Sequence, residues 1–368
     1  MDRYLIQELS WFFLFSVSLL TSLGVAIGTV SELVYKITEF ELPITIAILI
    51  FGCKIPEYAA YALPISILLT GLIVYSRLNS DRELVALLSF GISFYRIVFS
   101  TVMFSLVITG ITFLLNELIV PAANYQASLL QNPFIAKTEL NLQKQDIFYT
   151  EYASSQGNNG VKKLKTIYFA ERYAQPRLLG VTIISFQQDQ IEQIITAQSA
   201  QWNQQQQLWN LQSGAINYLN LNRQQNIIEE FVTTELPLPG TIFEIVTKER
   251  SPEEMNIRQA QEYLNLIKDS ANSIDIAKYA VRIQQKYAFP FICVVFVLIG
   301  SGLGAKYGQL NRAKSFSLGV AIVFIYYCIG FAIGSLGITG VISPFWAAWL
   351  PNLIGLLTGG YLLLTVNN

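Results

Sequence analysis

The chain has 368 residues, of which 52% are hydrophobic and 13% charged, and its mean hydropathy is +0.43. Soluble domains carry about 25% charged residues, so this composition indicates extensive apolar surface. The net charge of −1 gives no indication of a basic nucleic-acid-binding surface, and the absence of histidine excludes His-based catalysis, His-ligated haem and most catalytic zinc sites.

Apolar residues fall into two blocks, which flank a polar middle segment that holds most of the charged residues. A bilayer-spanning helix needs about 20 mostly apolar residues, so each block predicts three spans. The first block predicts spans at residues 11–34, 56–75 and 95–115, with a separate interfacial or partly embedded helix at 44–53 and a kink near Pro64. The second block predicts spans at residues 287–303, 316–336 and 344–364. Glycines in these later spans indicate either close helix packing or mere tolerance of glycine.

The positive-inside rule sets the orientation of these six spans. Basic residues gather on one predicted side: Arg3, Arg77, Arg82, Arg96, Lys306, Arg312 and Lys314. We therefore expect both termini in the cytoplasm and the polar middle segment outside it. The expected divisions are residues 1–120 with spans one to three, 121–286 as an extracytoplasmic domain, and 287–368 with spans four to six.

A short amphipathic helix is predicted between spans two and three, at about residues 80–91. Ser80 and Glu83 have the spacing of a capping box, and Gly91 suits the end of the helix. Its apolar stripe would consist of Val85, Leu88 and possibly Leu84. Such a helix either docks on a soluble motor protein or lies on the lipid surface.

The polar middle segment predicts β structure, because short stretches of alternating apolar and polar residues are separated by turn signals. One such signal is Ser213-Gly214. The expected strands are 146–152, 164–173, 179–187, 190–198, 207–212, 215–222 and 227–236. Their number and spacing suggest a sandwich, jelly roll or barrel. A helix capped by Ser251 should then lead the chain back to the membrane.

The sequence contains no recognisable catalytic or metal-binding constellation. It has no P-loop motif, and without histidine it has no Ser/His or Cys/His arrangement. Its three cysteines lie in or beside apolar runs and are expected to be buried hydrophobes: Cys53, Cys293 and Cys328. Few ionisable residues fall deep in the predicted spans, which argues against a proton-driven or ion-driven transporter.

Several stretches together resemble the LptF/LptG (YjgP/YjgQ) permease family of lipopolysaccharide export. They are Ile55-Pro56 with Leu63-Pro64, residues 77–93, Asn116 to Pro121, Thr196 to Ala200 with Trp209 to Leu211, residues 287–290, and Leu350-Pro351-Asn352. Their order covers nearly the whole chain. The resemblance implies a polytopic α-helical membrane protein with six transmembrane helices and an inserted extracytoplasmic all-β, jelly-roll-like domain.

The resemblance also implies partners. Two such permeases pair in the bacterial inner membrane, a cytoplasmic LptB-like ATPase dimer binds ATP and Mg, and LptC/LptA-like periplasmic jelly rolls receive the lipopolysaccharide. The chain itself would need no cofactor and would bind no nucleic acid. The residues expected at the ATPase are Arg82, Glu83, Leu84, Leu87 and Gly91. Those expected at the lipid are Lys36, opposite a phosphate, and the inward-facing Ile183 and Phe186.

The resemblance implies a permease subunit that extracts lipopolysaccharide or a related glycolipid and passes it through the β domain. Spans one and five would line a lateral opening for the lipid. One alternative is another ABC-type permease that transmits motion without carrying lipid. The other is a membrane-anchored periplasmic assembly or chaperone subunit whose β domain only binds partners.

Overall fold

The computed structural model describes residues 2–138, 145–153, 163–174, 177–187, 190–203, 206, 208–220, 225–236, 250–268, 273–307 and 312–366. The chain divides into two compact units. We call the first the membrane unit; it comprises residues 1–131, 251–260 and 277–368. We call the second the sheet unit; it comprises residues 132–250 and 261–276.

The described residues contain six helices that are long and apolar enough to cross a membrane, which confirms the predicted number of spans. The first begins as α1 (Asp2–Gly28) and continues as α2 (Val30–Glu39). With a rise of about 1.5 Å per residue, its 38 residues extend well beyond a hydrocarbon core of about 30 Å.

The second span is a single helix, α3 (Ile44–Ser80), of 37 residues. The prediction of a separate interfacial or partly embedded helix at 44–53 is therefore wrong, because these residues belong to the same helix as the span. Pro56 and Pro64 both lie inside α3 without ending it. Prolines are tolerated in membrane helices because neighbouring groups satisfy the backbone carbonyls that they leave unpaired.

The third span is also longer than predicted. It begins as α5 (Phe94–Leu114), passes through the π-helical turn η1 (Leu115–Ile119) and continues as α6 (Val120–Thr138). At Asn116-Glu117, where the sequence predicted the end of the span, the helix instead changes pitch and continues. The π turn ends two residues before Pro121, whose missing N–H cannot continue a regular hydrogen-bond ladder.

The second half of the chain provides the remaining spans. The elements are η2 (Pro252–Glu254), α8 (Ile257–Ile267), α9 (Ser273–Ala288), η3 (Phe289–Phe291), α10 (Ile292–Lys306), α11 (Arg312–Ile338) and α12 (Pro344–Val366). Ser251 precedes the short 3₁₀ turn η2 and makes no side-chain cap bond, so the helix predicted to begin there begins six residues later, at Ile257.

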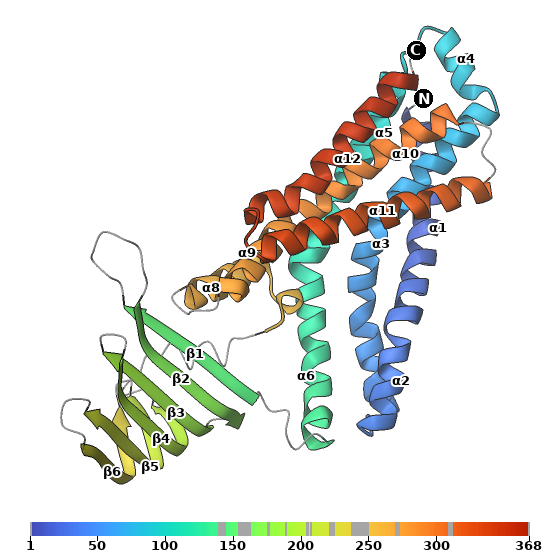
Figure 1. Cartoon of the computed structure of the whole chain (residues 1–368). Coiled ribbons are helices and arrows are strands. Elements are labelled where there is room, and N and C mark those ends of the chain that lie inside the picture. The colour runs from blue at the N-terminus through green and yellow to red at the C-terminus, as the bar shows by residue number, and fades with distance from the viewer. Residues whose placement is uncertain are drawn as a thin grey trace. The chain divides into compact units, whose positions relative to one another are not determined.

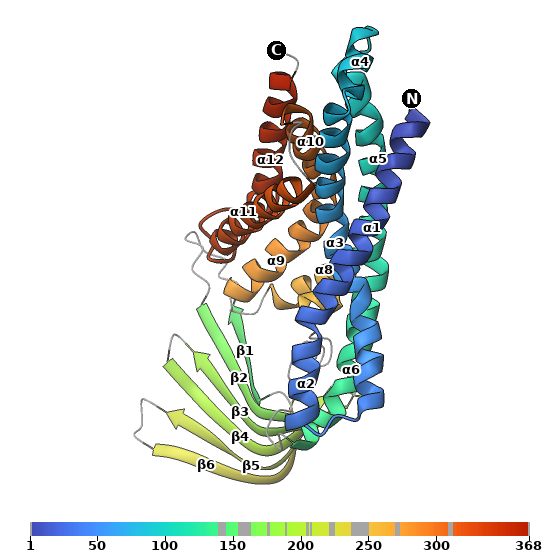
Figure 2. The same ribbon diagram turned by 90° about the vertical axis from the view of Figure 1, so that its right-hand side faces the viewer.

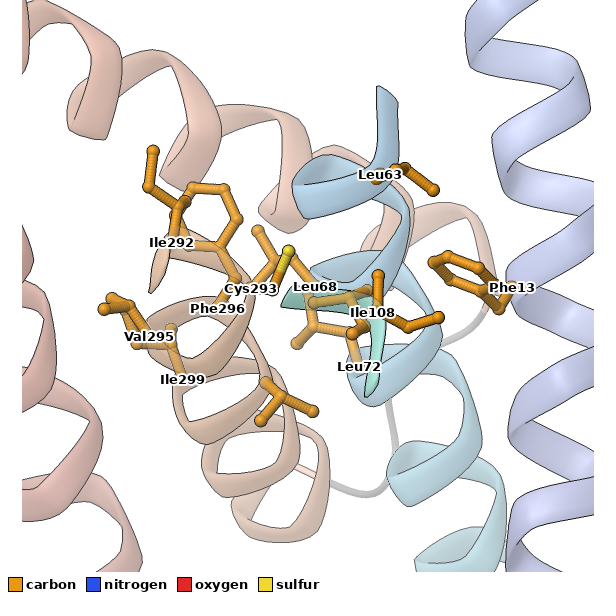
Figure 3. Close-up of a cluster of buried hydrophobic side chains, with 12 residues drawn as sticks. Phe13, Leu63, Leu68, Leu72, Ile108, Ile292, Cys293, Val295, Phe296 and Ile299 are labelled. Carbon is orange, nitrogen blue, oxygen red and sulfur yellow. The ribbon is translucent and has the colours of Figure 1, made fainter. Parts of the chain in front are cut away.

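The centre of the membrane unit is the contact between α3 and α10. Leu68 and Leu72 of α3 pack against Cys293 and Phe296 of α10, and Phe13 of α1 approaches from the other side (Figure 3). Glycines allow this close approach. A Cβ atom on Gly300 would lie 2.7 Å from the backbone oxygen of Leu68. At this crossing, close packing rather than mere tolerance explains the glycine.

Helix α11 lies at the periphery of the membrane unit, and few residues of its apolar stretch are buried. Its exposed side chains include Phe324, Ile325 and Phe331. Cys328 on the same helix is also exposed, so the prediction that it is buried is wrong, whereas Cys293 is buried in the core. An exposed apolar helix of this length fits a lipid or protein environment within the membrane.

The sheet unit contains one antiparallel sheet of six described strands in sequence order, as expected for an inserted β domain. Its strands are β1 (Gln145–Ala153), β2 (Lys163–Ala174), β3 (Arg177–Gln187), β4 (Gln190–Asn203), β5 (Leu208–Asn220) and β6 (Gln225–Leu236). The sheet is strongly curved (Figure 2). Its core consists of buried side chains from β2 to β5.

The turn predicted at Ser213-Gly214 does not exist, because β5 runs through these residues as one strand. Ser213 has a φ of 51°, and Gly214 pairs with Ala197 on β4 and Phe231 on β6. A Cβ atom on Gly214 would lie 2.0 Å from the backbone oxygen of Thr196. Ser213-Gly214 therefore marks a local irregularity in the backbone of β5 and a position where β5 lies very close to β4, instead of a turn.

Candidate functional site

The predicted short helix exists as α4 (Glu83–Ser89). It lies at the end of the membrane unit that also carries both chain termini (Figures 1 and 2). Two residues with positive φ bound it, Arg82 at 59° before the helix and Gly91 at 79° after it. These sharp backbone turns set α4 off from the two spans that it connects.

The predicted capping box at Ser80 and Glu83 is wrong. Helix α3 continues through Ser80, so Ser80 ends one helix instead of capping the next. Arg82 occupies the cap position of α4 without a side-chain cap bond, and Glu83 is the first residue of the helix. The carboxylate of Glu83 still lies at the positive end of the helix dipole.

Helix α4 has a buried and an exposed apolar face. Leu84 is only 3% exposed and joins a core cluster with Leu5, Leu78 and Phe94, and Leu87 packs against the same cluster. Val85 is 53% exposed, and Leu88 and Phe90 are exposed as well. The predicted stripe that grouped Leu84 with Val85 and Leu88 is therefore split. Leu84 and Leu87 attach α4 to the spans, and Val85, Leu88 and Phe90 form an exposed apolar face.

A polar network ties Glu83 to the first span. The hydroxyl of Tyr4 donates to Oε2 of Glu83 at 3.2 Å, and Nη2 of Arg77 donates to the hydroxyl of Tyr4 at 2.9 Å. Arg77 also forms an ion pair with Glu8. These contacts join α1, the end of α3 and the start of α4.

A second set of contacts fixes the beginning of α1 to α5. Asp2 forms an ion pair with Arg96 at 2.7 Å and accepts a hydrogen bond from Ser100 at 2.8 Å. Sequence reasoning missed Tyr4, Glu8 and Asp2. The available signal was the concentration of opposite charges at the same ends of the three predicted spans.

Lys36, the candidate for a lipid phosphate, lies on α2 with its side chain 13% exposed. Its ammonium forms an ion pair with Glu32 one helical turn away and donates a hydrogen bond to Gln131. Any anionic ligand would therefore compete with Glu32 for this ammonium.

The two candidate lipid residues of the β domain lie on β3. Ile183 is fully buried in the core of the sheet unit, with Tyr168 and Ile195 as its neighbours across the strands. Phe186 is half-buried and follows an irregularity in the pairing of β3 with β4, between Ser185 and Phe186. Ile183 therefore belongs to the core of the sheet unit, whereas Phe186 is not among the residues of that cluster.

Among the residues that the structure describes, no cluster of three or more Cys, Asp or Glu side chains is arranged to hold a metal ion. The polar groups at α4 instead make hydrogen bonds and ion pairs with one another. The candidate site is therefore the exposed face of α4, a helix that buried leucines attach to the spans and a polar network joins to the first span.

Comparison with protein families adds an independent observation. No curated protein matches the sequence. The model of the family described as "Lipopolysaccharide export system permease LptF/LptG" matches residues 3–365, which include the whole sheet unit and nearly all of the membrane unit. Together with six apolar helices and the inserted antiparallel sheet, this match shows that the chain belongs to the LptF/LptG family of inner-membrane, multi-pass permeases.

Proposed function

We propose that the chain is the transmembrane permease subunit of an ABC-type exporter that extracts lipopolysaccharide from the inner membrane. The lipid would pass through the sheet unit toward the outer membrane. Family membership supports the general role as an export permease. The chain has no P-loop motif, so ATP and Mg would bind to a separate ATPase subunit.

The observation that carries this proposal is the double-faced helix α4. Leu84 and Leu87 bury one face against helices of the membrane unit, while Val85, Leu88 and Phe90 leave the other apolar face exposed. A partner bound to the exposed face would move α4, and the buried face would pass that movement to the spans. Glu83 adds a negative charge at the edge of the same surface.

In the proposed orientation, the termini and α4 face the cytoplasm, where an LptB-like ATPase dimer would bind α4. The sheet unit would then lie in the periplasm. The positive-inside rule supports this orientation, because Arg3, Arg77, Arg82, Arg96 and Lys306 lie at the ends of spans on the proposed cytoplasmic side.

A second permease of the same family would complete the membrane assembly, and α1 and α11 would line the lateral opening. Their long exposed apolar faces support this role. Acyl chains gain about 0.8 kcal/mol per buried CH₂ group in the membrane, so their extraction needs both an apolar path and an external energy source. ATP hydrolysis by the partner would provide that energy.

The sheet unit would receive the lipid and pass it to LptC/LptA-like proteins. Ile183 and its buried neighbours form an apolar core, which would have to open along one side of the sheet to admit acyl chains. Among the described strands, β6 pairs only with β5, and its Ile227, Ile228 and Val232 are exposed. An edge strand of this kind supports β-augmentation by a neighbouring jelly roll.

Two alternatives predict different assemblies. A permease that only transmits motion would bind an ATPase and carry no lipid. A membrane-anchored assembly subunit would bind neither. The buried attachment of α4 to helices of the membrane unit favours a permease over an anchor, because an anchor needs no such transmission.

Purification of the chain from its native membrane, followed by identification of co-purified proteins and lipids, separates these three functions. We expect an ABC ATPase and lipopolysaccharide in the same complex. An ATPase without lipopolysaccharide would support the motion-transmitting permease. Recovery of neither would contradict both permease functions.

A further inference from the structure

The segment Glu253–Ile257 belongs to the membrane unit and leads into α8, whose residues from 261 onward belong to the sheet unit. Its alternate residues each offer one backbone polar group to a different helical element. The groups are the carbonyl of Glu253, the carbonyl of Met255 and the N–H of Ile257. The side chains of Met255 and Ile257 are themselves buried.

Glu117 binds the N–H of Ile257, the first residue of α8. Its two carboxylate oxygens lie 3.1 Å and 3.0 Å from that nitrogen, although the residues are 140 positions apart in the sequence. Glu117 belongs to the π turn η1, and π turns are frequent at functional sites. A carboxylate in this position satisfies an unpaired N–H group and favours the helix dipole.

The same helix has a local cap that does not need Glu117. The side-chain oxygen of Asn256 accepts from the N–H of Gln259 at 2.8 Å, and the side chain of Gln259 accepts from the N–H of Asn256 at 3.1 Å. This reciprocal pair forms a capping box. Because α8 is already capped locally, the contact from Glu117 attaches the helix to the third span.

Two further side chains hold the segment. Nζ of Lys286 on α9 donates to the carbonyl of Met255 at 2.7 Å. The side chain of Asn124 on α6 donates to the carbonyl of Glu253 at 3.5 Å, and its oxygen accepts from Lys54 at 3.2 Å. Lys54 in turn forms an ion pair with Glu57 at 2.9 Å on α3. Spans two, three and four therefore all reach this segment directly or through Asn124.

We propose that Glu117, Asn124 and Lys286 form a clamp that holds Glu253–Ile257 to the spans and transmits their movement along the chain into the sheet unit. Because the bonds to the segment end on its backbone, the hold does not depend on which side chains the segment carries. The inference rests on the proposed export function, and it adds three positioning residues that touch neither the ATPase surface nor the lipid candidates.

The clamp itself is tested by hydrogen–deuterium exchange of the Ile257 amide in the purified full-length chain. Glu117→Ala should speed this exchange about fivefold, the size of a typical capping loss. Glu117→Gln keeps one acceptor oxygen and should have a smaller effect. Glu253→Gln is the matched control, because it removes an exposed carboxylate from the same segment and keeps the carbonyl that Asn124 binds. Unchanged exchange in Glu117→Ala would overturn the clamp.

Transmission is tested in proteoliposomes that contain the complete permease–ATPase complex and lipopolysaccharide. Glu117→Ala and Lys286→Met should lower the lipopolysaccharide transferred per ATP several-fold, while the ATPase rate stays near wild type. Lys286→Arg keeps a donor and should restore the ratio. If Glu117→Ala raises amide exchange at Ile257 but transfers as much lipopolysaccharide per ATP as wild type, the proposed transmission of movement is contradicted.

The two readouts separate this inference from the export function. If the wild-type complex transfers no lipopolysaccharide while hydrolysing ATP, the export function is contradicted, and the exchange of Ile257 still decides whether the clamp exists. If wild type transfers lipid and the clamp variants also do so at the normal ratio, only the transmission role is contradicted.

Discussion

The hydroxyl of Tyr4 donates a hydrogen bond to the carboxylate of Glu83 across 79 positions of sequence. This bond joins the start of the first span to the first residue of α4. Arg77 donates to the same hydroxyl and pairs with Glu8, so the position of Glu83 depends on two spans. A partner that binds Glu83 would therefore act on α1 and α3 together.

Glu83→Gln should weaken the affinity for the ATPase about tenfold, equivalent to about 1.4 kcal/mol, because Gln can still accept from Tyr4 but lacks the charge needed for ionic docking. The measurement is a binding titration of purified ATPase against the permease in nanodiscs. The difference from wild type should shrink as salt rises, since salt screens exposed charges.

Asp81→Asn is the matched control for Glu83→Gln. It makes the same charge change at the exposed residue that follows α3, where the ion pair with Arg77 is long, at 3.8 Å, and it should bind the ATPase like wild type. Tyr4→Phe keeps the charge of Glu83 and removes its orienting bond, so we expect a smaller loss of affinity. If Glu83→Gln binds the ATPase with wild-type affinity, the charge of Glu83 is not needed for docking, and docking would depend on Val85, Leu88 and Phe90 instead.

Leu84→Ala and Val85→Ala compare two adjacent residues of α4, one that attaches the helix to the spans and one that is exposed to the proposed ATPase partner. Leu84 is buried, so its truncation should cost about 2–5 kcal/mol of stability. Val85 is exposed, so its truncation should leave thermal unfolding in detergent unchanged and weaken ATPase binding. Equal effects of the two variants on thermal unfolding would show that α4 does not have the two faces described.

Gly300→Ala should destabilise the membrane unit by about 1–3 kcal/mol, because the added methyl group meets the backbone oxygen of Leu68 where α3 and α10 cross. Gly330→Ala on α11 is the matched control, since nothing lies within 4 Å of its Cβ position. The unfolding midpoints of the two variants in the same detergent provide the comparison. Similar midpoints would contradict close packing at the crossing.

Glu32→Gln and Lys36→Gln should change lipid retention in opposite directions if Lys36 meets a phosphate. Glu32→Gln removes the carboxylate that neutralises the ammonium and should raise the lipopolysaccharide bound per purified complex. Lys36→Gln should lower it, and Lys306→Gln, at the other end of the spans, should leave it unchanged. Equal retention in all three variants, measured by mass spectrometry, would make Lys36 a structural residue only.

The six spans were predictable from sequence because apolar length and composition suffice to identify a membrane helix. The residues at which the spans begin and end were not predictable from sequence. The prolines of α3 suggested a break where neighbouring helices allow a continuous helix, and Asn116-Glu117 suggested an end where a π turn lets the helix continue. The Ser213-Gly214 signal was similarly overridden by pairing on both sides of β5.

The location of α4 was also predictable from sequence, but its orientation was not. Spacing alone grouped Leu84 with Val85 and Leu88, and only the packing of the spans separates the buried side from the exposed one. The apparent capping box failed because α3 continued through Ser80. Contacts such as Tyr4–Glu83 and Glu117–Ile257 join residues far apart in the chain, so no local pattern predicts them.

The most direct test of ATP-driven lipid export is a photocrosslinking amino acid placed at Ile183 in the reconstituted permease–ATPase complex with lipopolysaccharide. Ile183 faces the buried interior of the sheet unit, and the neighbouring Ile184, on the opposite face of β3, is the matched control position. We predict lipopolysaccharide crosslinks at Ile183 that require ATP hydrolysis, and few at Ile184. Crosslinks to protein alone at Ile183, in a complex that is hydrolysing ATP, would contradict passage of the lipid through the sheet unit.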